Sequence, residues 1–152
     1  MSVYVNRVLN LKHIKAIGFD MDYTLVEYQT QKFEEFVHGQ VIQKLIEHKN
    51  YPQKISQLKF NFDQVIQGLV IDRKLGNILK LSRYSKVKKS FHGTKEMDYQ
   101  ETQKTYKSMV IDLNDSGFQS LDTSFSISNG ALYAQLVDLK DQDESLPDYL
   151  QL

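Results

Sequence analysis

The sequence contains no cysteine and no tryptophan, and only 2 of its 152 residues are proline. The absence of cysteine excludes disulfides, thiolate metal sites and a cysteine nucleophile. No segment reaches the roughly 18 consecutive apolar residues of a membrane-spanning helix. The N-terminal segment also lacks the unbroken apolar stretch of a signal peptide. We therefore expect a cytoplasmic protein with no membrane contact.

The sequence also lacks net charge, because 19 basic side chains balance 19 acidic ones. No overall electrostatic field draws the protein onto nucleic acid, so no nucleic-acid partner is expected and any phosphate recognition must be local. One basic cluster is interpreted as the solvated face of a strand: Arg83, Lys86, Lys88 and Lys89. The four histidines lack the paired spacing of a metal site and are interpreted as solvated or core residues: His13, His38, His48 and His92.

The first third of the sequence predicts a strand followed by a helix. Residues 13–20 form a short apolar run without helical spacing that ends at carboxylates, which predicts a buried strand with polar function at its C-terminal end. Apolar residues then recur every three or four positions over residues 33–48, which predicts an amphipathic helix ending near Asn50 and Pro52. Its predicted inner face consists of Phe33, Phe36, Val37, Val41, Ile42 and Leu45, and its polar face of Glu34, Glu35, Gln40, Lys44 and Glu47.

The remaining sequence predicts a small antiparallel meander and two further helices. The expected strands cover residues 68–72, 78–82 and 86–92, with a turn at Gly76 and Asn77 between the first two. A short helix is expected over residues 99–107 and a stronger one over 125–139, capped by Thr123 or Ser124. Its predicted inner face consists of Phe125, Asn129, Leu132, Leu136 and Leu139.

Two aspartates, Asp20 and Asp22, follow the first predicted strand. An extended backbone points both side chains to the same side, so one carboxylate can attack phosphorus while the other transfers a proton. Two carboxylates facing a phosphate repel it, so a cation is required, and oxygen ligands favour Mg²⁺. Thr24 offers a hydroxyl and an amide to phosphate oxygens. The predicted intermediate is an aspartyl-phosphate; the alternative for an isolated Asp-x-Asp is a solvated loop or helix cap.

Residues 20–25 read D-x-D-x-T-L, which resembles the first signature of the haloacid dehalogenase-like phosphohydrolases. Three longer segments resemble successive blocks of the cytosolic purine 5′-nucleotidases, the branch that prefers IMP and GMP. They are GFDMDYTL, FNFDQVIQGLVIDRKLGNILKLSRYSKVKKSFHG and DTSFSISNGALYAQLVDLKD. The resemblance covers residues 5–141, nearly the whole chain.

This resemblance implies a role for each motif residue. Asp20 becomes the nucleophile and Asp22 the general acid and base, with Mg²⁺ held by the Asp20 side chain and the Asp22 backbone carbonyl. Phe125 becomes the ring that stacks on the purine; its alternative is the first apolar anchor of a helix. The implied fold is α/β: residues 1–50 supply the first strand, catalytic loop and first helix of a Rossmann-like core, and residues 51–152 part of a mixed α/β cap.

Three later signatures of such enzymes cannot be located: a phosphate-binding Ser or Thr, a lysine and an acidic pair. The core is therefore expected to be incomplete, and the chain to be the N-terminal portion of a hydrolase that acts on purine nucleoside 5′-monophosphates. Two alternatives stay open: a catalytically inactive remnant that binds a partner, and a phosphatase of another phosphorylated metabolite. The expected protein partner is a second copy or a missing C-terminal part.

Overall fold

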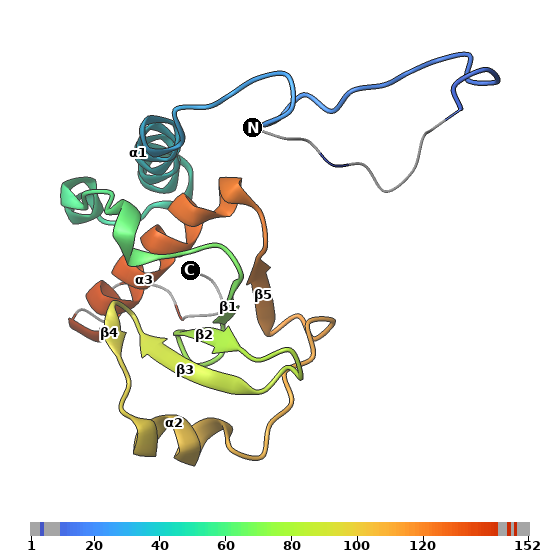
Figure 1. Ribbon diagram of the computed structural model, residues 1–152. Helices are drawn as coiled ribbons and strands as arrows, with labels where there is room; N and C mark the ends of the chain where they lie inside the picture. Colours follow the sequence, from blue (N-terminus) through green and yellow to red (C-terminus); the bar gives the residue numbers. More distant parts are fainter. Residues whose placement is uncertain (1–3, 5–9, 143–145, 147, 149–152) are drawn as a thin grey trace.

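The computed structural model describes residues 4, 10–142, 146 and 148. Within them the chain is mixed α/β, with a five-stranded antiparallel sheet and three α-helices (Figure 1). The elements in chain order are α1 (Thr30–Lys49), the 3-10 turns η1 (Gln53–Gln57) and η2 (Phe62–Gln64), β1 (Leu69–Asp72), β2 (Asn77–Leu81), β3 (Val87–His92), β4 (Lys95–Glu96), α2 (Tyr99–Tyr106), β5 (Phe118–Leu121), η3 (Ser124–Ser126) and α3 (Ile127–Gln142). The predicted α/β class, with its antiparallel meander, is confirmed.

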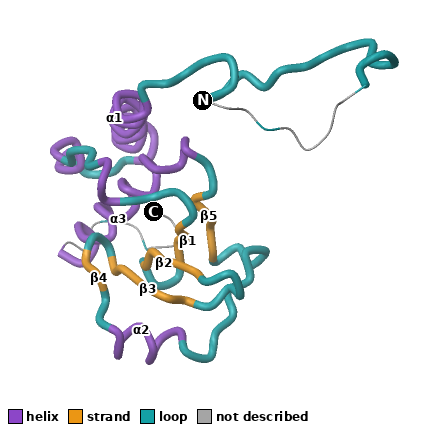
Figure 2. Tube along the Cα trace, in the orientation of Figure 1, coloured by secondary structure: helices purple, strands orange, loops and turns teal. Residues whose placement is uncertain are grey.

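The sheet has the strand order β4-β3-β2-β1-β5 (Figure 2). The first three strands in sequence form the predicted meander, with Asp72 opposite Asn77 at the first turn. Gly76 takes a φ of 70° in this turn, a backbone conformation that glycine adopts at little cost. Two strands were not predicted: the two-residue β4, and β5, which pairs antiparallel with the other edge of β1.

Helix α3 lies between the sheet and α1 (Figure 1). Ala131, Ala134 and Val137 pack toward the sheet, whereas Leu132 and Leu136 pack with residues of α1 and η1. A helix covered on two sides is apolar over most of its circumference. The predicted single inner face is therefore too narrow, and the side chain assigned to it at Asn129 is exposed.

Helix α1 presents a different face to the core from the one predicted. Glu34, His38 and Ile42, spaced four residues apart, are buried, whereas Phe36 is 65% exposed. The prediction placed Glu34 on the solvent side and Phe36 inside. Positions four apart share one helix face, so burying Ile42 also brings Glu34 and His38 inward and turns Phe36 outward. The helix ends as predicted, with Asn50 in the left-handed conformation at a φ of 56°.

Helix α2 and the segment after it cover the other face of the sheet, where Tyr106 and Ile111 pack with Val70 and Leu79. The buried carboxylate of Asp72 accepts a hydrogen bond from the Tyr106 hydroxyl at 2.7 Å. That hydroxyl in turn accepts one from the Asn77 amide at 2.7 Å. These bonds satisfy polar groups that would otherwise be costly to bury.

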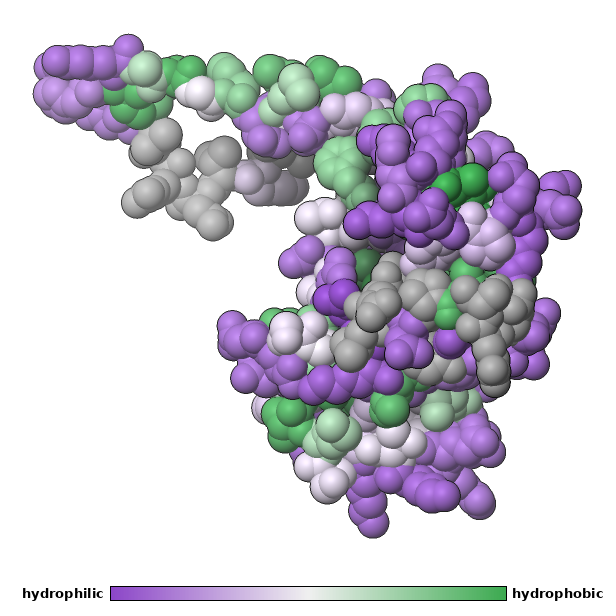
Figure 3. All heavy atoms as spheres, turned by 180° about the vertical axis from the view of Figure 1, so that it is seen from behind, coloured by the Kyte–Doolittle hydropathy of each residue, from purple (hydrophilic) through white to green (hydrophobic). Residues whose placement is uncertain are grey.

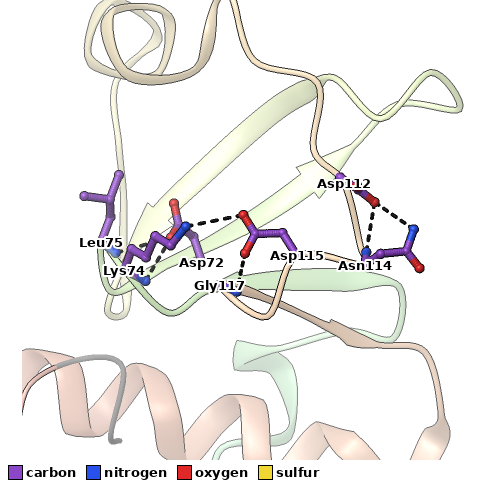
Figure 4. Close-up of polar contacts among 7 residues, drawn as sticks. All are labelled: Asp72, Lys74, Leu75, Asp112, Asn114, Asp115 and Gly117. Carbon is purple, nitrogen blue, oxygen red and sulfur yellow. Dashed lines mark hydrogen bonds and ion pairs between the residues drawn. The ribbon is translucent and has the colours of Figure 1, made fainter.

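Residues 112–117 form a loop that is fastened to the β1–β2 turn (Figure 4). Asp72 accepts hydrogen bonds from the amides of Lys74 and Leu75 at 3.0 and 3.3 Å. Asp115 accepts one from the Gly117 amide at 2.8 Å and lies 3.3 Å from the Lys74 ammonium. The Gly117 amide, followed by Lys74, holds the pKa of Asp115 below its ordinary value. The loop leads directly into β5 and so determines where that strand begins.

The strand predicted over residues 13–20 is not formed. Every residue from 10 to 21 is exposed, and the segment projects from the rest of the protein (Figure 1). Large apolar side chains lie uncovered along it, as the green atoms of the projecting arm show (Figure 3). A strand of a parallel sheet is stabilised by hydrogen bonds to neighbouring strands, and the described residues place none beside this segment. This expectation was therefore wrong for the chain as described.

Candidate active site

The motif residues lie on a compact loop at the base of the arm. The amides of Leu25 and Val26 both donate to the Met21 carbonyl at 3.0 Å, and the Tyr23 amide donates to the Val26 carbonyl at 2.9 Å. Tyr23 takes a φ of 57°, which is uncommon for a residue with a side chain. Strained backbone of this kind is often found at functional sites. The loop thus closes on itself immediately after the first aspartate.

The two aspartates have different surroundings. Asp20 is exposed, and it makes no hydrogen bond to any described residue. Asp22 is half-buried, and its Oδ1 accepts a hydrogen bond from the Tyr28 hydroxyl at 2.6 Å. This hydrogen bond, followed by burial and the negative charge of Asp22, raises the pKa of Tyr28. The first aspartate is therefore open to a ligand, while the second is oriented by a neighbouring side chain.

Phe125, the predicted purine-stacking residue, contacts the motif loop through an aromatic cluster. The cluster comprises Tyr23, Tyr28, Phe33 and Phe125. The ring centre of Phe125 lies 6.1 Å from that of Tyr23, 5.7 Å from Tyr28 and 5.6 Å from Phe33. Such separations are typical of favourable aromatic pairs. The cluster joins the loop, the start of α1 and the residues just before α3, although Phe125 is over 100 positions from Asp22 in the sequence.

Two residues near the site were not predicted from the sequence. Tyr28 follows the motif without a recognisable pattern, and only the structure reveals its bond to Asp22. Glu34 was assigned to the polar face of its helix, yet it is fully buried and contacts the start of α3. The four-residue spacing of Glu34, His38 and Ile42 was the available signal, and the charge of the glutamate concealed it.

Thr24 and the aspartates offer only oxygen ligands. The Thr24 amide donates to the Met21 carbonyl at 3.3 Å, so the hydroxyl is the freer of its two groups. Asp20 and the Asp22 backbone carbonyl match the ligands that Mg²⁺ prefers, and Mg²⁺ commonly retains several waters. Among the described residues no three His, Asp or Glu side chains converge as a metal centre. The donor chemistry therefore suits Mg²⁺, with a small protein contribution.

The other candidate features lie away from the motif. A cavity of about 850 Å³ between the end of β3, β4, α2 and the end of α3 is lined by residues that include His92, Lys104 and Asp141, but by none of the predicted site residues. The basic cluster of residues 83–89 is solvated as predicted, with exposed basic side chains. No helix of the described chain is long and apolar enough to cross a membrane.

The candidate site thus combines paired aspartates, a strained loop and adjoining aromatic rings. A family model described as the 5′ nucleotidase family matches residues 3–151. The chain therefore belongs to the 5′ nucleotidase family.

Curated relatives agree with this assignment. A 5′-nucleotidase domain-containing protein of Dictyostelium discoideum is 26% identical over 139 residues, which cover 89% of this chain and 23% of the relative. Human 5′-nucleotidase domain-containing protein 1 is 28% identical over 133 residues, covering 81% of this chain and 29% of the relative. The chain thus spans between a fifth and a third of the length of these relatives.

Proposed function

We propose that the chain is the N-terminal part of a cytosolic, Mg²⁺-dependent phosphohydrolase of the haloacid dehalogenase-like type that acts on purine nucleoside 5′-monophosphates. Family membership supports hydrolysis of nucleotides in general. The observation that carries the narrower proposal is the contact between Phe125 and the rings beside Asp22. An aromatic platform next to a carboxylate pair suits a ligand with a flat base and a phosphate.

The proposed reaction has two steps. In the first, an Asp20 carboxylate oxygen attacks phosphorus, the bond between phosphorus and the 5′-oxygen breaks, and Asp22 gives its proton to the departing oxygen. In the second, Asp22 takes a proton from a water molecule, which attacks phosphorus and releases phosphate and the free Asp20 carboxylate. Tyr28 holds the Asp22 side chain through its 2.6 Å hydrogen bond.

The remaining residues bind and orient the substrate. The Thr24 hydroxyl binds a phosphate oxygen, and the Phe125 ring stacks on the base. Bound Mg²⁺, held by Asp20 and the Asp22 carbonyl, would offset the negative charge of the phosphate and the carboxylates.

The exposed arm supports a role for additional protein. In the arm, Ile17 and Phe19 are 63% and 69% exposed, and Leu25 in the loop at its base is 65% exposed, an unusual concentration of uncovered apolar side chains. We propose that a C-terminal part of the protein supplies strands that pair with residues 13–20 and completes the site. The same exposure favours a second candidate function, in which the chain binds a partner without turning over nucleotide.

Phosphate release from IMP and GMP with Mg²⁺ tests these proposals. The 152-residue chain is compared with a longer form that continues through its downstream sequence, and Asp20→Asn serves as the matched inactive variant. Turnover in either form that disappears in Asp20→Asn supports the proposed hydrolase. Turnover that persists at the parent rate in Asp20→Asn contradicts the mechanism, and no turnover in either form favours the partner-binding candidate.

A further inference from the structure

Glu34 is a fully buried carboxylate that joins two helices. Its Oε2 accepts a hydrogen bond from the amide of Ser128 at 2.7 Å, across 94 positions of sequence. Its other oxygen, Oε1, is buried without a hydrogen-bond partner among the described residues, and so is the Ser128 hydroxyl. The carboxylate therefore accepts one short hydrogen bond through Oε2, while Oε1 accepts none from the described residues.

This bond provides a partner for an amide at the start of α3. The first amides of a helix lack partners within it and lie at the positive end of the helix dipole, where a carboxylate is favourable. Thr123, one of the two residues predicted to cap this helix, makes no side-chain cap hydrogen bond. The Ser128 amide, at the second residue of α3, is instead satisfied by a glutamate of α1. The start of α3 is thereby fixed to α1.

A buried carboxylate is an expensive way to join two helices. An apolar side chain of similar volume would avoid the desolvation of the carboxyl group and of its unsatisfied oxygen. It would also provide no directional bond, because apolar packing tolerates small displacements that a hydrogen bond does not. The contribution of Glu34 is therefore a fixed relative position of α1 and the start of α3.

The residues next to this bond belong to the candidate site. Phe33, adjacent to Glu34, packs its ring edge-to-face with Phe125 at 5.6 Å. Phe125 precedes Ser128 by three residues and also contacts Tyr28 at 5.7 Å. Tyr28 in turn donates to Asp22. The bond between Glu34 and Ser128 therefore fixes the start of α3, just after Phe125, to α1, which begins just after the residue that orients Asp22.

We propose that Glu34 is a positioning residue that sets the distance between the base-stacking ring and the carboxylate pair. The proposal rests on the proposed function, because it takes Phe125 as the residue that contacts the base. Glu34 is fully buried, so it acts through α3 and does not touch the substrate. It should therefore matter for substrates that carry a base and little for those that do not.

The test compares IMP with ribose 5-phosphate, which has the same phosphate and sugar but no base. Both are assayed with Mg²⁺ in the form of the protein that releases phosphate from IMP, and binding is measured by calorimetry in parallel. Glu34→Met fills the same volume without an acceptor, whereas Glu34→Gln keeps an oxygen for the Ser128 amide. Glu35→Gln, an exposed neighbour on the same helix, is the matched control.

Glu34→Met should lower kcat/KM for IMP by about tenfold, the effect expected when base stacking is impaired. It should change kcat/KM for ribose 5-phosphate by less than about threefold, and Glu34→Gln and Glu35→Gln should resemble the unsubstituted protein. If Glu34→Met lowers kcat/KM equally for both substrates, or for neither substrate, the positioning role is wrong. If it does not fold, Glu34→Asp, whose shorter side chain retracts the carboxylate, must show the same selective loss for the proposal to stand.

A different result would contradict the proposed function itself. An unsubstituted protein that neither binds nor hydrolyses IMP in preference to ribose 5-phosphate contradicts base recognition by Phe125, whatever the Glu34 variants do. A preference for IMP that Glu34→Met leaves intact contradicts only the positioning role.

Discussion

The hydrogen bond between Tyr28 and Asp22 is the most direct chemical contact at the candidate site. Because the bond and the negative charge of Asp22 both favour the neutral phenol, they raise the pKa of Tyr28 above its ordinary value of 10.0. Asp22→Asn removes the charge and should therefore lower the pKa of Tyr28. NMR titration of ¹³C-labelled tyrosine measures the pKa of Tyr28. The Tyr28→Phe variant lacks the Tyr28 signal and so assigns it. Asp20→Asn should leave the pKa of Tyr28 unchanged, and an equal shift in both variants would contradict the assigned contact.

Tyr106 should make the protein sensitive to alkali. Burial is the largest cause that raises the pKa of Tyr106 above 10.0. A folded-state pKa above the unfolded-state value means that the folded protein holds the proton more tightly, so stability is intact below about pH 10 and falls as pH rises further. Urea unfolding at pH 8 and pH 10.5 should show a lower midpoint at the higher pH. In Tyr106→Phe the urea midpoint should fall less between pH 8 and pH 10.5. If it falls as much as in the unsubstituted protein, the effect comes from other tyrosines.

Two helical glycines should respond in opposite directions to substitution by alanine. A Cβ at Gly130 of α3 would lie 2.6 Å from Leu121 Cδ1 and 2.9 Å from Val65 Cγ1. The resulting overpacking, about 1–3 kcal/mol, should exceed the gain in helix propensity of about 1 kcal/mol. A Cβ at Gly39 of α1 would meet nothing within 4 Å. Gly39→Ala should therefore stabilise the protein by about 0.5–1 kcal/mol, and Gly130→Ala should destabilise it.

Urea unfolding of both variants decides between these expectations. Equal stabilisation by the two substitutions would mean that α3 does not pack closely against β5. The comparison therefore tests the central position of α3 in the fold.

The sequence pattern predicted the elements that carry a local signal of their own. It did not predict the features that depend on contacts with residues distant in the sequence. Short segments around turn residues located β1, β2 and β3, and the three- and four-residue spacing located α1. Strand β5 was missed because residues 112–117 fix its start through contacts to another turn. The two-sided burial of α3 was missed for a related reason, since a second packing layer leaves no separate periodic signal. The inward glutamate was missed because its charge concealed the four-residue spacing that it shares with His38 and Ile42.

The candidate site was predictable only in part. The sequence motif indicated Asp20, Asp22 and Thr24, and family resemblance alone indicated Phe125. The strand predicted over residues 13–20 was wrongly expected within this chain. An apolar segment indicates that its side chains need to be buried, but it does not indicate which part of the protein buries them. The catalytic roles of these residues stay predictions.

The protein as a whole should associate through its exposed arm. Ile17 is 63% exposed within a run of uncovered apolar side chains, whereas Ile66, at 56%, lies apart from that run. Ile17→Lys should therefore shift the 152-residue chain toward monomer in sedimentation measurements over a range of concentrations. Ile66→Lys, the matched substitution elsewhere, should leave association unchanged. A monomeric parent chain, or an equal effect of both variants, would contradict association through the arm.

The connection between α1 and α3 also implies an order of folding. Strands β1 to β4 pair with sequence neighbours across short turns, and such local contacts form early because little chain entropy is lost in closing them. The bond between Glu34 and Ser128 closes a loop of 94 positions and should form late. The ring of Phe125 therefore acquires its neighbours near the end of folding, so we expect the aromatic cluster to be assembled only on a sheet that already exists.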